Sequence, residues 1–433
     1  PESRMNILDQ PPAPSPHSPV SGPQSPASAS IALDHGPTTQ SGSMIDSSGA
    51  VLATAKALNP QQELGVDILA RLDAARNGQG KKLQDILVKQ LHRLVARLLD
   101  IAGRLPEDVV GIAAAGNPGI SCLLRNAPVD ALLFPPHKTP FRNLQKISPA
   151  EIDIGLSARM ELLPTVSGFV GGDLVACLLA IADQKPGTLM IDLGTNAELA
   201  VWDGRRWLVA SAAAGPAFEA GNISAGMLHS AGAVTDVFLD GDRLELTVAD
   251  GGQPCGLCGS GLVALVAAAR RGGLIEASGR ILSADEVETN LRSYLVDQGG
   301  TNAICFYRDV SGALLLTQQD IRSLQLAKAA VHAGVCVLLE KTGTPAAAVE
   351  RVWLTGALGT SLSLDALKRV ALLPEPMLDK TSFMVNGVLA GLQAYLMEKN
   401  RHRRLDDLVA TLQPFPLSGT PAFEKHFLDS LGF

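Results

Sequence analysis

Short and long apolar stretches alternate along most of this chain. The short ones, such as 31–33, 51–57, 109–115 and 352–354, have the length and residue types of buried strands. In the longer segment 82–101, apolar residues recur at helical spacing, which predicts an amphipathic helix. Further helices are predicted to begin near Gly171, Gly259 and Asp320. Strands that alternate with helices indicate an α/β sheet architecture.

Two of the predicted strands end in similar polar turns. An apolar strand enters Asp192-Leu193-Gly194-Thr195-Asn196, and a second apolar strand follows it. A weaker copy stands at Asp34-His35-Gly36-Pro37-Thr38-Thr39. The glycine lets the backbone turn close to a ligand, the turn N–H groups and threonine hydroxyls suit an anion, and the aspartate suits a metal. Two such hairpins, roughly 160 residues apart, predict two lobes that close on one nucleotide.

These turns supply the first candidate site residues. Asp34 and Asp192 are predicted to hold Mg²⁺, largely through water, because Mg²⁺ keeps most of its hydration shell. The residues predicted to contact the phosphates are Gly36, Thr38, Thr39, Gly194, Thr195 and Asn196. The alternative is that the two carboxylates cap turns and that the other residues are ordinary turn formers.

Hydrolysis of a nucleotide's terminal phosphate needs a positioned water and charge stabilisation more than covalent chemistry. The candidate catalytic residues are Asp173, Glu198 and Asp192, with Glu219 as an alternative base. Asp173 follows a glycine pair at a predicted helix start and could orient the attacking water. It could equally be an N-cap residue.

Composition and charge exclude several classes of protein. The chain has 433 residues, of which 46% are hydrophobic and 18% charged, as is ordinary for a globular protein. The net charge is −7 and the longest basic cluster is 399–404, so we expect no nucleic-acid partner. Apolar runs such as 174–182 and 262–269 are about half as long as a membrane span requires, so none is expected. Without a secretory signal, a cytoplasmic location is the default expectation.

The six cysteines are scattered and form no disulfide framework or iron–sulfur spacing. Cys255 and Cys258 form a C-x-x-C, which we interpret as a turn entering the helix at Ser260; a redox dithiol is the alternative. Residues 1–29 are rich in Pro and Ser, which predicts a disordered tail or a linker. Residue 1 is Pro rather than Met, which leaves open that the chain is a piece of a longer protein.

Three segments together resemble the nucleotide site of the actin/hexokinase/Hsp70 superfamily. They are two phosphate hairpins, 34–39 and 192–198, and an adenosine loop at Gly356-Ala357-Leu358-Gly359. The resemblance implies a two-lobed ATPase fold with duplicated ribonuclease H-like lobes. It also implies that Gln325 and Lys328, which share one face of a predicted helix, lie near the nucleotide. An exposed polar stripe is the alternative for these two residues.

A narrower resemblance is to the ATPase domain of the reductive activators of corrinoid proteins. The segments that carry it are 57–61, 116–118, 168–173, 192–196, 214–226, 258–262 and 317–330. Gly215 lies in the most specific of them and is predicted to contact the nucleotide. The resemblance implies that ATP and Mg²⁺ bind and that ATP turnover drives reduction of Co(II) to Co(I) on a corrinoid protein or methyltransferase. A homodimer is also possible.

This chain departs from that family in its electron supply and its phosphate loops. It has no iron–sulfur domain, so electrons are expected from a separate ferredoxin-like protein or from another domain. Pro37 has no N–H, and Ala197 stands where the second loop of the family usually has glycine. Two alternatives therefore stay open: a binding or regulatory module that does not hydrolyse ATP, and a small-molecule kinase.

The resulting domain prediction has four parts. Residues 1–29 form the tail or linker, 30–161 the first lobe with phosphate loop 1, and 162–395 the second lobe with phosphate loop 2 and the adenosine loop. Residues 396–433 form a C-terminal segment that packs back on the core.

Overall fold

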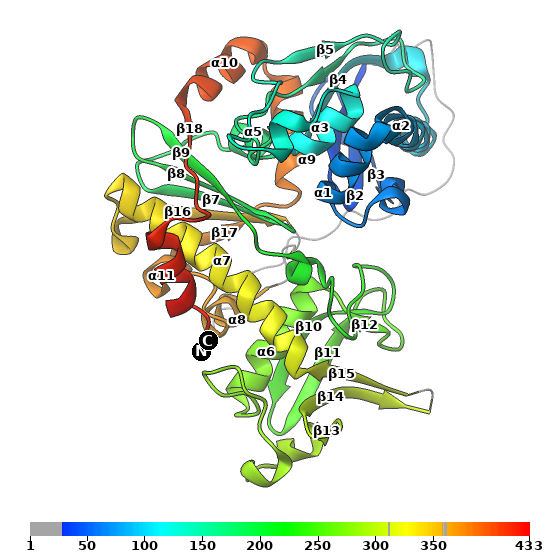
Figure 1. Cartoon of the computed structure of the whole chain (residues 1–433). Helices are drawn as coiled ribbons and strands as arrows, with labels where there is room; N and C mark the ends of the chain where they lie inside the picture. Colours follow the sequence, from blue (N-terminus) through cyan, green and yellow to red (C-terminus); the bar gives the residue numbers. More distant parts are fainter. Residues whose placement is uncertain (1–27, 311, 357, 359–361) are drawn as a thin grey trace.

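The computed structural model describes residues 28–310, 312–356, 358 and 362–433, and these form two lobes (Figure 1). Each lobe is built on a six-stranded sheet, and two three-stranded sheets extend the second lobe. Residues 1–27, most of the predicted tail or linker, lie outside the described part of the chain. Strand β1 already begins at Ala29, which the sequence pattern assigned to the tail.

Sheet A, in the first lobe, has the strand order β3-β2-β1-β4-β6-β5. Its antiparallel strands are β1 (Ala29–His35), β2 (Thr39–Asp46) and β3 (Val51–Leu58). Next to β1 lie the parallel strands β4 (Val109–Gly116) and β6 (Met160–Leu162), and then β5 (Gln145–Ile147). One face is covered by α2 (Gly80–Ala102), whose predicted apolar stripe is buried, and by α1 (Ile68–Ala74), α3 (Pro118–Arg125) and α4 (Asp130–Leu133). Pro118 starts α3 soon after β4 ends at Gly116, because Asn117 accepts from the Ile120 N–H as an N-cap.

Sheet B, in the second lobe, repeats this topology with the order β17-β16-β7-β8-β9-β18. Its antiparallel strands are β7 (Thr188–Leu193), β8 (Ala197–Trp202) and β9 (Trp207–Ala212). The remaining strands are β16 (Arg351–Gly356), β17 (Thr381–Phe383) and β18 (Leu412–Pro414). Strand β16 pairs parallel to β7, β17 parallel to β16, and β18 parallel to β9. Because β1 and β7 hold the same place in the two sheets, the lobes are a structural duplication.

The second lobe buries its largest core around two helices, α6 (Gly259–Arg271) and α7 (Gln318–Thr342), with α8 (Leu364–Arg369) beside them. The inserted sheets are β11-β10-β12 and β13-β14-β15, at the bottom of Figure 1. Their bounds are β10 (Ala233–Asp240), β11 (Arg243–Val248), β12 (Gly256–Leu257), β13 (Leu295–Asp297), β14 (Asn302–Asp309) and β15 (Gly312–Thr317). Helix α7 has the length and composition of a membrane span, yet 72% of its most apolar window is buried inside the protein, so it is a core helix.

A layer of two crossed helices joins the lobes. Helices α5 (Gly172–Leu179) and α9 (Gly387–Met397) pack against each other and form one core with Ala32 of sheet A and Met190 of sheet B. They approach very closely, because a Cβ on Gly391 would overlap the carbonyl oxygen of Ala176. The two sheets are therefore fixed to one common layer.

The C-terminal segment lies against the second lobe and the helix layer (Figure 1). Helix α10 (Arg401–Thr411) contacts α9 and α5, β18 adds a strand beside β9, and α11 (Pro421–Asp429) packs along α7.

Candidate functional site

The two predicted aspartates occupy equivalent places in the two sheets. Asp34 is the penultimate residue of β1, and Asp192 is the penultimate residue of β7. In register with Asp34 on β2 stands Ser41, whose hydroxyl donates to the Asp34 carboxylate at 3.2 Å. In register with Asp192 on β8 stands Glu198, which accepts from Ser211 at 3.3 Å. Both aspartates lie on the sheet faces that meet the α5–α9 layer.

Four carboxyl groups gather where the lobes meet. Burial, followed by the neighbouring Asp173, raises the pKa of Asp34 and that of Asp192 to about 7. Burial also raises the pKa of Asp173 to about 6, and burial followed by Asp173 and Asp192 raises the pKa of Glu198 well above its usual value. Like charges held this close stabilise a bound cation.

The donor set fits a hydrated Mg²⁺. Among the described residues, no group of three or more His, Cys, Asp or Glu side chains is arranged to ligate a metal directly. Asp34 of the first lobe is instead close enough to Asp192 of the second to raise its pKa, after burial and Asp173. Mg²⁺ keeps several waters and needs few direct carboxylates, so this arrangement suits it better than an ion that requires a full protein cage.

Phosphate loop 1 is held from behind through its carbonyl groups. The Asn59 side chain donates to the Gly36 carbonyl at 3.3 Å, and the Asn59 N–H donates to the Thr38 carbonyl at 2.9 Å. The guanidinium of Arg71, which is fully buried, donates to the Pro37 carbonyl at 2.6 Å and to the Gly65 carbonyl at 2.8 Å. A peptide N–H points away from the carbonyl of the same peptide, so the N–H groups of Thr38 and Thr39 face the opposite side. Arg71 was missed in the sequence analysis, because its loop contact joins residues 34 positions apart.

Phosphate loop 2 is shorter than loop 1 and lies beside a glycine that is sterically required. Three residues, 194–196, separate the last paired residues of its strands, against four, 36–39, in loop 1. Gly356 ends the neighbouring strand β16 with a φ of +96°, and a Cβ there would overlap the Leu193 carbonyl and lie 2.6 Å from the Asp192 carboxylate. The adenosine loop therefore begins directly beside Asp192. Gly359, the other predicted residue of that loop, lies outside the described residues.

Ala197 does not restrict the turn, contrary to the concern raised by the sequence. It is the first residue of β8, pairs with Leu193 and is fully buried in the core of the second lobe. Alanine adopts the extended conformation of a strand without backbone strain.

Helix α5 brings its N-terminal end into the acid cluster. Asp173 is the second residue of α5 and accepts from the Leu174 N–H at 2.8 Å, but the N-cap is Gly171, so the N-cap alternative for Asp173 is wrong and its catalytic role stays a prediction. Gly171, just before it, lies against Gly116 and Asn117 at the end of β4. The buried Cys177 thiol lies 3.8 Å from the Asp192 carboxylate, a contact that the sequence did not suggest.

Gln325 and Lys328 lie on one buried face of α7, which excludes an exposed polar stripe. Gln325 donates to the carbonyl of Leu431 at 2.8 Å, and Lys328 donates to the carbonyl of Gly432. The Lys328 ammonium also lies 5.5 Å from the centre of the Phe433 ring. In this structure both side chains thus contact the C-terminal residues, and their role at a nucleotide stays a prediction.

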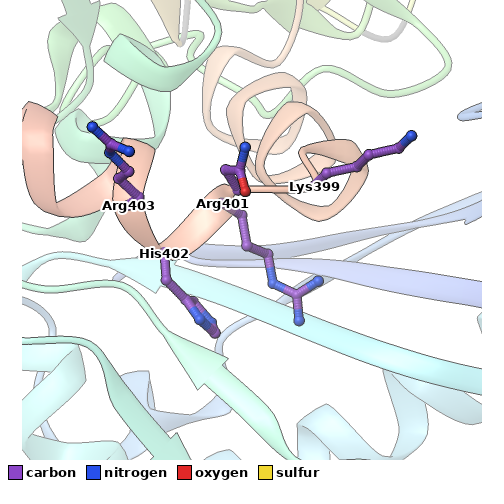
Figure 2. Close-up of a pocket in the computed structure, with 5 residues that line it drawn as sticks. Lys399, Arg401, His402 and Arg403 are labelled. Atoms are coloured by element: carbon purple, nitrogen blue, oxygen red, sulfur yellow. The ribbon is translucent and has the colours of Figure 1, made fainter.

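A separate basic hollow of about 440 Å³ lies at the start of α10, lined by Lys399, Asn400, Arg401, His402 and Arg403. Figure 2 shows Arg401 and His402 pointing the same way, toward the strands, while Lys399 and Arg403 extend to either side. Arg401 and His402 both contact the buried carboxylate of Glu161 on β6, at 3.0 and 2.8 Å. These two side chains therefore fasten α10 to the first lobe.

The C-x-x-C pair has a structural environment. Cys258 is buried, precedes α6 and donates to the Val234 carbonyl at 3.3 Å, whereas Cys255 is exposed. Both are free thiols. The helix that they precede packs tightly, because a Cβ on Gly259 would overlap the Phe218 carbonyl and one on Gly261 would overlap that of Val234.

The duplicated sheets, with a carboxylate hairpin from each lobe, define a two-lobed protein of the actin/hexokinase/Hsp70 kind, as the sequence predicted. Comparison with known protein families identifies the family to which this chain belongs. The C-terminal ASKHA domain of RACo matches residues 187–433, and the RACo middle region matches residues 29–185. The chain belongs to the RACo family, and the predicted relationship to reductive activators is confirmed. An ASKHA domain implies nucleotide binding.

Three similar proteins illustrate the relationship. The corrinoid activation enzyme RamQ of Eubacterium limosum is 30% identical over 92% of this chain and 69% of its own length. A [Co(II) methylated amine-specific corrinoid protein] reductase of Methanosarcina barkeri is 24% identical over 85% of this chain and 70% of its own. The solved structure of a reductive activator for corrinoid, iron-sulfur protein superposes with a TM-score of 0.86 at 26% identity, covering 95% of this chain and 67% of that one.

Proposed function

We propose that this chain is the ATP-binding and ATP-hydrolysing part of a reductive activator that returns a corrinoid protein from Co(II) to Co(I). The observation that carries the nucleotide part is the meeting of Asp34 and Asp192, from equivalent hairpins of the two lobes, in one acid cluster. The corrinoid part is supported by relatives described as a corrinoid activation enzyme and a corrinoid protein reductase.

The residues divide the work at the nucleotide. Thr38, Thr39, Thr195 and Asn196 bind phosphate oxygens, and Asp34 and Asp192 hold Mg²⁺ through water. Mg²⁺ held there would offset phosphate charge. Asp173, or the largely buried Glu198, orients the water that attacks the terminal phosphorus, which releases ADP and phosphate. Burial, followed by Asp173 and Asp192, raises the pKa of Glu198, and a raised pKa suits a group that accepts a proton.

Closure of the lobes on ATP couples to reduction. Co(II) takes one electron to become Co(I), and that electron comes from a separate iron–sulfur protein of the ferredoxin kind or from another domain. Nucleotide binding shifts the complex toward the arrangement in which the corrinoid accepts the electron. We place this activity in the cytoplasm and expect a homodimer to be compatible with it.

One set of measurements tests the proposal. Calorimetry with MgATP measures binding, and phosphate release measures turnover with and without a corrinoid methyltransferase partner. We expect binding by the isolated chain and faster turnover with the partner. Absence of MgATP binding would end the proposal, binding without any turnover would favour a regulatory module, and phosphate transfer to a metabolite would favour a kinase. Asp192→Asn serves as the matched loss-of-site variant.

A further inference from the structure

One carboxylate bridges the two phosphate loops. Glu219 ends the short 3-10 helix Pro216–Glu219 and accepts from the Thr195 N–H and the Thr195 hydroxyl, each at 3.1 Å. Its other contact is with the first lobe, where the Thr38 hydroxyl donates to it at 3.4 Å. The same side chain reaches over Gly194, whose missing Cβ would lie 3.5 Å from a Glu219 oxygen. Glu219 thus accepts from donors of both hairpins.

We propose that Glu219 is a built-in anion that occupies the phosphate-binding donors of the empty site and is displaced when the terminal phosphates of ATP arrive. This rests on the proposed function, because it assumes that ATP binds at the two hairpins. A carboxylate and a phosphate both take only donors, so they compete for the same N–H and hydroxyl groups. An empty site without such a group would leave these donors to water and the two loops unconnected.

The position of Glu219 connects this exchange to the second lobe. Glu219 lies in the segment 215–224. At the start of this segment, the Gly215 N–H donates to the Thr195 carbonyl at 2.8 Å. In the middle, the Phe218 carbonyl lies so close to Gly259, the first residue of α6, that a Cβ there would overlap it. At the end, Ser224 donates twice to Asp320, the residue that closes the capping box of α7. Release of Glu219 from the threonines therefore frees a segment that touches the starts of both core helices.

The contacts argue against Glu219 as the base for hydrolysis. Both of its oxygens are engaged by loop donors, so in this state it does not face a water aligned with a phosphate. A base and a competing anion also differ in what their removal does. Loss of a base slows turnover at unchanged affinity, whereas loss of a competitor tightens binding.

The experiment titrates MgATP, MgADP and AMP by calorimetry into the full chain and into Glu219→Gln, Glu219→Ala and Glu219→Asp. We expect Glu219→Ala to bind MgATP roughly tenfold more tightly, which corresponds to the loss of about one competing charge-assisted contact. Glu219→Gln should tighten MgATP binding less than Glu219→Ala. The affinity of Glu219→Asp, whose side chain is one methylene shorter, should lie between those of Glu219→Gln and the wild type. Affinity for AMP, which lacks the terminal phosphates, should not change. Glu245→Gln, an exposed carboxylate on β11 in the same lobe, is the charge-matched control.

The outcomes separate this proposal from the proposed function. If the wild type binds MgATP and the Glu219 variants bind it equally or more weakly, the competing-anion role is wrong and the nucleotide site stands. If the wild type binds no MgATP but Glu219→Ala does, Glu219 blocks the site without being displaced, so both the exchange and the proposed function of this chain are overturned. If no variant binds, both are overturned. Thermal unfolding of each variant shows whether it is folded.

Discussion

Arg71→Met tests the idea that loop 1 is shaped from behind. The guanidinium of Arg71 is fully buried and donates to two backbone carbonyls, one of them Pro37 in the loop. Methionine keeps most of the apolar stem and removes both donors. Loop 1 would then lose one of the three described hydrogen bonds to its carbonyl groups, the other two being donated by Asn59.

The expected magnitude follows from these contacts. A hydrogen bond from a charged group contributes about 1.5–3 kcal/mol, so two give about 3–6 kcal/mol. Burial lowers the pKa of Arg71, which means that the buried charge carries a desolvation cost. Replacing Arg71 by methionine removes that cost as well as the hydrogen bonds. We therefore expect the free energy of unfolding to fall by about 2–4 kcal/mol. The affinity for MgATP should fall roughly tenfold, because the loop donors are no longer preorganised.

Urea denaturation and MgATP calorimetry measure the two effects. Arg403→Met is the matched control, since its side chain is 85% exposed and its ion pair with Asp407 spans 3.8 Å. Such a pair contributes about 0–1 kcal/mol, so the control should behave almost like the wild type. A loss of stability in Arg71→Met no larger than that of the control, together with unchanged affinity, would refute the reasoning.

Three further changes probe other parts of the structure. The pKa of Asp34 and of Asp192 is raised to about 7, so between about pH 4 and 7 the unfolded chain releases protons that the folded chain keeps. The free energy of unfolding in EDTA should therefore fall as pH rises through this range and level off above it, and Asp192→Asn should flatten the slope; an unchanged slope would contradict the assignment. Glu161→Gln loosens α10, because the carboxylate contacts Arg401 and His402 of that helix, and should cost about 2 kcal/mol in urea denaturation and speed proteolysis within 399–411, whereas equal cleavage rates would argue against the contact. Gly391→Ala forces α5 and α9 apart and should destabilise the protein by about 3 kcal/mol, seen as a lower Tm, and an unchanged Tm would show that the helices yield easily.

The sequence pattern predicted those elements whose structure depends on neighbouring residues, namely the two hairpins and the long amphipathic helix. The strand-turn-strand signal around Asp192 and Asp34 depends on neighbouring residues only, and both hairpins have the expected strands and glycine turns. The equivalence of the two aspartates could be predicted because a repeated motif ends the same strand in each lobe. The long helix 82–101 followed from its apolar spacing.

Contacts between distant segments could not be read in this way. Helical spacing put Gln325 and Lys328 on one face of α7, but nothing in it says that residues 431–433 cover that face. Glu219 was only an alternative base, because its bond to Thr38 spans 181 positions. The strand β18 has three residues, too few for an apolar pattern, and it exists because the edge of β9 offers partners.

The crossed helices between the sheets govern how the chain can fold during its synthesis. Sheet A is complete in sequence at Leu162, yet α9, which covers one of its faces, is made more than 200 residues later. A nascent first lobe therefore leaves the ribosome with an apolar face that only the far end of the chain can close. Until then, that face is a place where chaperones or other nascent chains can bind.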